Sequence, residues 1–468
     1  MYPPKIRLLF TGGTMQSANT NSTNHFSSRL GFIMAAAGSA VGVGNIWGFP
    51  TQAATHGGGA FLLVYLVLIF ILGIPMLMAE LMIGRHGQTN PADAMGKLGC
   101  NSLSRNLGKT IGLISIVTAG LIYTFYSILS GWFVSYAIAP IATAMGSHDT
   151  AAWLMDFSLS RNLVFTLIFS ALVFLVLLQG LQEGIEKWSK RLMPLLLIML
   201  IAGVAYIFTL NGASEGITAL LTPNVAKAIA PDTLINALGQ TFFSLTIGTG
   251  AMMVYGSYLS QKENIAKLTI WVAFTDSGIA FLAAFLIIPA MYVAQHNGVQ
   301  IFSAEGKLID SDALVFTVLP ALFSTLGDTA NLIISVVFFM LLIIAGLTSA
   351  ISIAEVPTSY VMQKCGFSRQ RATLIIGLLL TSLSLLLAVF FETLFSFTIM
   401  LTTQMAQPLV ALGIAIYLGW IWRQSQLLKA ISGQEGVDAT GLFWRIWPRY
   451  VKYVCPVLII AIAIRQFV

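Results

Sequence analysis

Long apolar segments constrain this chain more than any other feature. Eleven of them are separated by polar connections. A helix needs roughly 20 apolar residues to cross the hydrocarbon core of a bilayer, and each segment is about that long or longer. The sequence therefore predicts an all-α polytopic membrane protein. The predicted spans are 31–52, 60–84, 109–140, 161–180, 190–210, 233–259, 267–294, 329–362, 372–391, 395–422 and 449–467.

The scarcity of charged side chains excludes most soluble classes. Only 9% of the 468 residues are Asp, Glu, Lys or Arg, and 57% are hydrophobic. Soluble domains carry about 25% charged residues, so this chain lacks the charge to cover a soluble surface. A soluble enzyme, a nucleic-acid-binding protein and a disordered scaffold are disfavoured. The three cysteines are widely spaced and the five histidines are isolated, which indicates neither a disulfide framework nor a metal-binding motif.

The distribution of Lys and Arg predicts the orientation. Of the 24 basic residues, 20 lie in connections on one side if the spans alternate, and four lie on the other side. Basic connections stay in the cytoplasm, so we expect a cytoplasmic N-terminus and, with eleven spans, an outer C-terminus in a cell inner membrane. We expect three parts: a mobile cytoplasmic tail (1–28), a transporter core of ten spans (29–425), and a cytoplasmic loop with the eleventh span (426–468).

Two of the spans contain residues that interrupt a helix. The first span has four glycines, an asparagine and a proline within 38–50, and the sixth has small polar residues and glycines within 242–250. Glycine allows the backbone to leave the helix, and the freed amides and carbonyls need partners inside a bilayer. An ion and a charged substrate are suitable partners. Close helix packing is the alternative explanation for such small residues.

The positions of the two interruptions favour the functional explanation. They lie five spans apart, which is the spacing that a five-plus-five inverted repeat requires. In transporters built this way, discontinuous helices form the binding site near the middle of the membrane. We therefore expect broken helices 1 and 6 around a central site.

Four motifs resemble the neurotransmitter:sodium symporter family. They are SSRLGFIMAAAGSAVGVGNIWGFP at 27–50, GQTFFSLTIGTGAMMVYGSYL at 239–259, AGLTSAISIAEVP at 345–357, and Phe125-Tyr126 followed by Trp132. The resemblance runs from about Phe26 to the end of the chain, and eleven spans is a form seen among bacterial members. It implies a two-bundle inverted-repeat fold and sodium-driven symport by alternating access.

The resemblance also implies two sodium sites built from oxygen atoms, which hard cations prefer. The first would use the Ala40 carbonyl, the side chains of Asn45, Ser244 and Asp276, and the carboxylate of the substrate. The second would use the carbonyls of Gly38, Val41 and Ala345 and the hydroxyls of Thr348 and Ser349. A carboxylate shared between ion and substrate would make the binding of each favour the other.

The implied substrate site has polar ends and an apolar wall. Tyr126 and the amides near Val43 and Gly44 would meet the substrate carboxylate, since an exposed helix N-terminus suits an anion. Gly42 leaves no acidic side chain where amine-transporting relatives carry aspartate, so the substrate must supply its own carboxylate. We expect a neutral, hydrophobic or aromatic, L-amino acid. The expected residues are Ala40, Val43, Gly44, Ile122, Tyr126, Phe243, Thr246, Thr249 and Ile353.

Three acids lie inside the spans, where a charge costs about 2.5–3.5 kcal/mol. We assign Glu80 to a network that supports the broken first helix. Glu355 lies near the inner end of span eight, where exposure of its side chain to water is an alternative to burial. Asp276 corresponds to a neutral asparagine in chloride-dependent animal relatives, so chloride is not expected to be needed here.

The outer gate is expected to lack an ion pair. Gly48 stands where many relatives have a basic residue that pairs with an acid on the tenth helix. Span ten of this chain contains no acid, and Gln404 is the nearest counterpart of that acid in a loose alignment. Aromatic and loop packing, including Tyr126, would close the site instead. The outer connection 295–328 is expected to form a short helical lid or a solvated loop.

Other functions remain open at this point. The chain lacks HExxH, GxSxG and P-loop motifs, which disfavours an enzyme. A proton-coupled amino acid transporter, or a non-transporting sensor or channel on the same fold, are the alternatives. We expect an amino acid and membrane lipid as partners, no nucleic acid, and a monomer or weak homo-oligomer.

Overall fold

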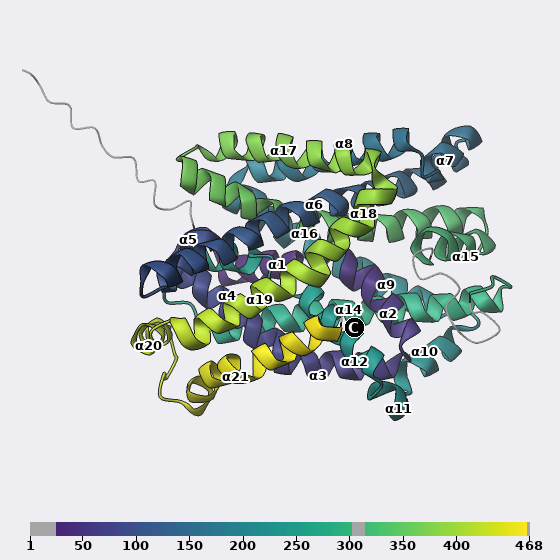
Figure 1. The fold of residues 1–468 in the computed structure, drawn as a ribbon. Helices are drawn as coiled ribbons and strands as arrows, with labels where there is room; N and C mark the ends of the chain where they lie inside the picture. The colour runs from purple at the N-terminus through teal and green to yellow at the C-terminus, as the bar shows by residue number, and fades with distance from the viewer. Residues whose placement is uncertain (1–24, 302–313, 466–468) are drawn as a thin grey trace, which may run out of the picture.

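A computed structural model describes residues 25–301 and 314–465, and the side chains of 25–301 and 315–461. The described residues form one elongated helical bundle (Figure 1). Most of the tail expected at 1–28 lies outside this range. Its last residues are held in place, because the backbone of Phe26 and the hydroxyls of Ser27 and Ser28 are hydrogen-bonded to distant segments.

Within the described residues, each of the eleven predicted spans is built from helices, with breaks in the first and the sixth. Spans one to five comprise α1 (Arg29–Ala40), a π-helical turn (Gly44–Gly48) and α2 (Phe49–Thr55); α3 (Gly59–Leu68), a π-helical turn (Ile69–Gly73) and α4 (Ile74–Gly87); α6 (Ser102–Ala144); α8 (Leu159–Leu178); and a π-helical turn (Leu181–Glu186) with α9 (Lys187–Ile207). Spans six to eleven comprise α12 (Pro231–Ser244) and α13 (Ala251–Ser257); α14 (Ile265–His296); α16 (Asp328–Cys365); α17 (Arg369–Val389); α18 (Phe391–Ile399), a π-helical turn (Met400–Ala406), α19 (Gln407–Ile416) and a π-helical turn (Tyr417–Ile421); and α21 (Leu442–Arg465).

Short helices occupy the connections. They are α5 (Pro91–Leu98), α7 (His148–Met155), α10 (Ala213–Leu221), α11 (Val225–Ala228), α15 (Leu319–Thr325), which continues the π-helical turn Leu314–Val318, and α20 (Gln424–Ser432). The expected helical segment of the loop 295–328 is therefore present, while residues 302–313 lie outside the described range.

Eight helices in the described residues are long and apolar enough to cross a membrane, and the bent pair α1 and α2 adds a ninth. Neither the pair α12 and α13 nor α21 meets that test of length and composition. The count of eleven spans thus stays a prediction, although each segment is helical.

Both interruptions are visible in the backbone. The two halves of the first span meet at an angle of 59°. In the sixth span, φ is +53° at Thr246, +88° at Gly248 and +79° at Gly250. These left-handed conformations suit glycine, which explains two of the glycines in that motif.

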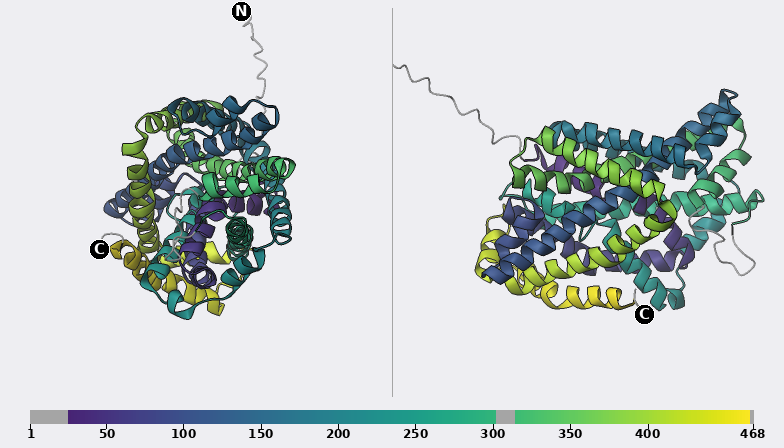
Figure 2. Two further views of the ribbon diagram at one scale, coloured as in Figure 1. Left: turned by 90° about the vertical axis from the view of Figure 1, so that its right-hand side faces the viewer. Right: turned by 45° about the horizontal axis from the view of Figure 1, so that its top comes forward.

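The first span lies inside the bundle. Helix α1 contacts α9, α14 and α16, and it is seen among the surrounding helices when the molecule is viewed along its long axis (Figure 2, left). Its small side chains make this close approach possible: a Cβ atom added at Gly38 would lie 3.2 Å from the Cβ of Thr348 on α16. The break between α1 and the turn at Gly44 is therefore enclosed by protein.

The basic connections gather at one end of the bundle, which we call the basic end: residues 85–109, 187–191, 262–267, 364–371 and 423–452. Helices α5 and α20 lie there, whereas α7, α10, α11 and α15 lie at the opposite end (Figure 1). The ion pairs between described residues also lie at the basic end. They are Arg29–Glu263, Arg29–Glu435, Lys187–Glu183, Lys190–Glu186 and Arg369–Glu355.

Candidate functional site

Three of the four residues predicted for the first sodium site form one buried cluster. The Asn45 amide nitrogen donates to Asp276 Oδ1 at 2.7 Å and to Ser244 Oγ at 3.0 Å. The Ser244 hydroxyl donates to Asp276 Oδ2 at 2.7 Å. Each residue comes from a different place: the first break, the end of α12, and the middle of α14. The fourth, Ala40, lines the adjoining cavity.

Tyr65 on α3 belongs to this cluster and was missed by the sequence analysis. Its hydroxyl donates to Ser244 Oγ at 3.0 Å and lies 3.4 Å from Asp276 Oδ2. Tyr65 and Asp276 are both fully buried. No glycine or proline next to Tyr65 marks it as special, and a tyrosine in an apolar run is most simply read as a core residue.

The residues predicted for the second sodium site meet where α1 ends against α16. The Thr348 hydroxyl lies 3.2 Å from the Ala345 carbonyl, and Gly38 abuts Thr348. The Ser349 hydroxyl donates to the Ser39 carbonyl at 3.0 Å. The backbone leaves the helical conformation at Val41, where ψ is 102°.

A small cavity of about 20 Å³ adjoins the first cluster, between the two breaks, α6, α16 and α19. Eight of the nine predicted substrate residues line it: Ala40, Gly44, Ile122, Tyr126, Phe243, Thr246, Thr249 and Ile353. Val43 is the exception, although its amide is hydrogen-bonded to Tyr126. Gly42, Asn45, Ser349 and Gln407 complete the lining. The lining includes the apolar side chains of Ile122, Phe243 and Ile353 and the hydroxyls of Tyr126, Thr246 and Thr249.

Tyr126 is tied to the first break. Its hydroxyl accepts a hydrogen bond of 3.0 Å from the Val43 amide. Gly42 is directly beside it, because a Cβ atom added at Gly42 would lie 2.5 Å from that hydroxyl and 3.1 Å from Ser349 Oγ. On the other side the Phe243 ring packs against Gly44, 2.3 Å from where a Cβ atom would stand. The absence of side chains at both glycines thus shapes the cavity.

Polar side chains satisfy the backbone groups freed at the two breaks. Gln240 donates to the Gly44 carbonyl at 2.9 Å, and Gln407 donates to the Ile247 carbonyl at 3.3 Å. Glu80 accepts a hydrogen bond of 2.6 Å from the Gly248 amide. Glu80 therefore contacts the break in the sixth span and not, as the sequence analysis assigned it, the break in the first.

Glu355 is buried and paired. Its carboxylate binds both terminal nitrogens of the Arg369 guanidinium, at 3.0 and 2.7 Å, and accepts from the Tyr258 hydroxyl at 2.6 Å. The solvated alternative is wrong for this residue, which is 0% exposed. The pair joins α16, α17 and the end of the sixth span at the basic end of the bundle.

Aromatic side chains close the opposite end. Phe316, in the turn that leads into α15, contacts the rings of Trp47, Trp132 and Tyr136 at centroid distances of 5.7, 5.6 and 5.0 Å. Trp132 also donates to Asn162 Oδ1 at 2.8 Å. We call Trp47, Trp132, Phe133, Tyr136, Phe157 and Phe316 the aromatic cap.

Among the described residues, no ion pair joins the helices at this end of the bundle. Gly48 has no side chain to contribute, and Gln404 is exposed. Arg161 is buried beneath the cap, with its guanidinium carbon 4.9 Å from the centre of the Phe157 ring and 5.4 Å from that of Tyr136. It also donates hydrogen bonds to the Leu154 carbonyl at 3.2 Å and to Asn162 Oδ1 at 2.9 Å.

These observations define a class of protein. Two broken helices bring unwound backbone, hydroxyls and a buried carboxylate together around a cavity inside a membrane bundle, which is the arrangement of ion-coupled secondary transporters. The model of the sodium:neurotransmitter symporter family matches residues 23–158 and 155–468, and the chain belongs to this family.

Known relatives agree with that assignment. An uncharacterized sodium-dependent transporter of Haemophilus influenzae is 33% identical over 96% of this chain and 99% of its own. One from Bacillus subtilis is 32% identical over 93% of this chain and 96% of its own. The crystal structure of MhsT in complex with L-phenylalanine matches 94% of this chain and 98% of its own, at 31% identity and a TM-score of 0.80. The chain is thus a transporter and not an enzyme.

Proposed function

We propose that this protein couples the inward movement of sodium to uptake of a neutral L-amino acid with a hydrophobic or aromatic side chain. The proposal rests on one observation, that two features lie side by side. The oxygen cluster of Asn45, Ser244 and Asp276 adjoins a cavity whose sides are apolar and whose end presents Tyr126. Membership of the family itself supports sodium-dependent symport.

The chemistry of the cluster suits sodium. A carboxylate, an amide and two hydroxyls offer only hard ligands once the Asn45 amide turns its oxygen inward, and Ala40 adds a carbonyl. A buried carboxylate is costly without a compensating charge. The ion pairs between described residues do not include Asp276, so a bound cation is the natural partner for it. The groups around Gly38, Thr348 and Ser349 support a second sodium site of neutral oxygens.

The cavity supports the substrate class. Ile122, Phe243 and Ile353 give it apolar sides, and Gly42 leaves room for a carboxylate beside Tyr126. MhsT, the matched structure, holds L-phenylalanine. Because about 20 Å³ accommodates little more than a water molecule, an amino acid requires a different conformation of the site. Rotation of the Phe243 ring away from Gly44 would open this space.

The orientation of the protein in the membrane follows from the distribution of its basic residues. With the basic end in the cytoplasm, the aromatic cap faces outward, and transport alternates between opening the cap and opening the network at Glu355. Proton-coupled uptake is the second candidate, because the carboxylate of Asp276 is able to carry a proton in place of an ion.

A binding screen tests the proposal. The purified protein would be titrated with each of the twenty amino acids in sodium and in potassium buffers, at several pH values. We expect binding of a subset of neutral amino acids only in sodium. Equal binding in potassium would contradict sodium coupling, and binding restricted to charged amino acids would contradict the substrate class.

A further inference from the structure

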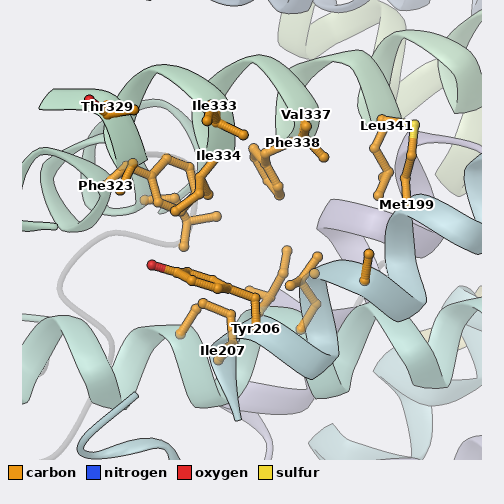
Figure 3. A pocket seen from close by; sticks show the side chains of 17 residues that line it. Met199, Tyr206, Ile207, Phe323, Thr329, Ile333, Ile334, Val337, Phe338 and Leu341 are labelled. Carbon is orange, nitrogen blue, oxygen red and sulfur yellow. The ribbon is translucent and has the colours of Figure 1, made fainter. Parts of the chain in front are cut away.

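A second, much larger cavity lies away from the breaks, between α9, α14, α15 and α16. Its volume is about 570 Å³, within the range of roughly 300–1,000 Å³ usual for small-molecule sites. Figure 3 shows side chains from both walls facing each other across it, with Ile333, Val337 and Phe338 above and Tyr206 below. Nearly all of its lining is aliphatic or aromatic. Such a lining offers an amino acid no partner for its charged groups.

The cavity opens onto the side of the bundle that faces lipid. Ile333 on α16 is 57% exposed, and Ile198 on α9, just beyond the lining, is 64% exposed. Helices α9, α14 and α16 are all long and apolar enough to span a membrane. Large exposed apolar side chains on such helices contact hydrocarbon rather than water. The molecules that reach this opening are therefore those of the bilayer.

The polarity along the cavity matches that of a lipid. The hydroxyls of Tyr206 and Thr329 lie toward one end, and Met199 and Leu341 lie at the other (Figure 3). Thr329 stands at the start of α16, so the polar end is the end of the bundle that carries the aromatic cap. From Thr329 to Leu341 the helix rises about 18 Å, close to half of a hydrocarbon core about 30 Å thick.

From these features we propose that the cavity binds one acyl chain of a phospholipid from the leaflet on the side of the aromatic cap. The chain would enter between α9 and α16 with its headgroup beside Tyr206 and Thr329 and its methyl end near Met199 and Leu341. With the sidedness proposed above, this is the outer leaflet. The binding itself does not depend on which amino acid is transported.

One continuous segment of the chain contributes to both the cavity and the aromatic cap. Leu319 and Phe323 line the cavity from α15, and Phe316 lies in the turn that runs directly into this helix. A bound acyl chain would pack against one side of this segment while the cap holds the other. Since a ligand favours the conformation it binds best, the lipid would stabilise the closed position of Phe316.

Photolabelling in vesicles tests the proposal. The protein would be reconstituted with a phospholipid carrying a diazirine in its acyl chain, and the adducts would be located by mass spectrometry. We expect adducts concentrated on the cavity residues of α9 and α16. Ala202→Trp and Ala330→Trp fill the cavity from opposite walls and should each reduce these adducts about tenfold. Ala205→Trp, an exposed position on α9 outside the lining, is the matched control and should leave them unchanged.

Three results would overturn the proposal. One is an even distribution of adducts over all lipid-facing helices, including the exposed face of α17 at Leu378, which indicates bulk contact only. Another is unchanged labelling of the cavity in both tryptophan variants, with their folding verified by thermal unfolding. The third is labelling of the cavity by a free fatty acid probe but not by the phospholipid probe.

Discussion

Asp276 sets the charge of the candidate site. Its carboxylate is fully buried and accepts hydrogen bonds from Asn45, Ser244 and Tyr65. These three groups are neutral, so they orient the carboxylate without cancelling its charge. A sodium ion would cancel it, which removes the need for a separate anion to balance the ion.

Chloride independence follows from that charge. We expect equal uptake by the natural protein in chloride and in gluconate media. Asp276→Asn removes the negative charge and should either abolish uptake or make it chloride-stimulated. The measurement is initial uptake in the two media for both proteins. Strong chloride dependence of the natural protein would refute this account of Asp276.

The sodium ligands make a separate prediction. Asn45→Ala and Ser349→Ala each remove one oxygen from a different proposed sodium site. Each should raise the sodium concentration that gives half-maximal uptake, by about tenfold if the lost ligand contributes about 1.4 kcal/mol. Uptake measured over a series of sodium concentrations gives this value. Unchanged sodium dependence in both variants would show that the sites lie elsewhere.

Gly42 tests the place of the substrate carboxylate. We expect Gly42→Asp to abolish uptake, because the new side chain would begin 2.5 Å from the Tyr126 hydroxyl and bring a charge that repels the substrate. Gly239→Asp is a useful control, since a Cβ atom there meets nothing within 4 Å. Substrate binding and uptake would be measured for both. Normal uptake by the Gly42 variant would place the substrate elsewhere.

At the scale of single residues, the sequence identified those site residues that lie in or near recognisable motifs. Asn45, Ser244 and Asp276 stand in or near recognisable breaks, and the structure brings them together. Tyr65 was not found because it is a single polar residue in a long apolar run, and Gln407 because it is one of several polar residues in its span. Their partners come from helices distant in the chain, and such pairings depend on the tertiary fold.

At the scale of elements, apolar length and glycine content predicted the helices and the two breaks. They did not predict the π-helical turns, which occur within the spans at Gly44–Gly48, Ile69–Gly73 and Met400–Ala406. They also placed the start of the last helix at 449, whereas α21 begins at Leu442. Arg445 and Pro448 interrupt the apolar and aromatic residues of 442–448, so this segment does not look like part of a membrane span, although it continues the same helix.

Glu80 allows the support of the second break to be tested. Glu80→Gln keeps an oxygen that accepts from the Gly248 amide, whereas Glu80→Leu leaves this buried amide unpaired. An unpaired buried donor costs about 1–3 kcal/mol. We therefore expect the leucine variant to lower the thermal stability and the uptake more than the glutamine variant does. Equal effects of the two would mean that the hydrogen bond to Gly248 is unimportant.

The aromatic cap makes a prediction about access. Phe316→Ala removes the ring that joins Trp47, Trp132 and Tyr136, so the site should open more often toward that side. A Gly48→Cys reporter should then react faster with a membrane-impermeant thiol reagent added outside. Phe390→Ala removes an exposed ring outside the cap and is the control. An unchanged rate in the Phe316 variant would show that the cap does not limit access.

At the scale of the whole molecule, the two ends of the bundle differ in how they are held closed. The basic end uses ion pairs, such as that of Glu355 with Arg369, while the opposite end uses the aromatic cap. An alternating-access transporter must break each set in turn. The site at the two breaks lies between them, so the same sodium and substrate would be exposed first to one side and then to the other.

Uptake into sealed vesicles tests the central claim most directly. The purified protein would be reconstituted, and uptake of the neutral amino acid that binds best would be followed under an imposed inward sodium gradient, under a potassium gradient, and under a pH gradient alone. We predict accumulation above the external concentration only with the sodium gradient, and its loss when an ionophore collapses that gradient. Accumulation driven by the pH gradient without sodium, or equilibration without accumulation, would contradict sodium-coupled symport.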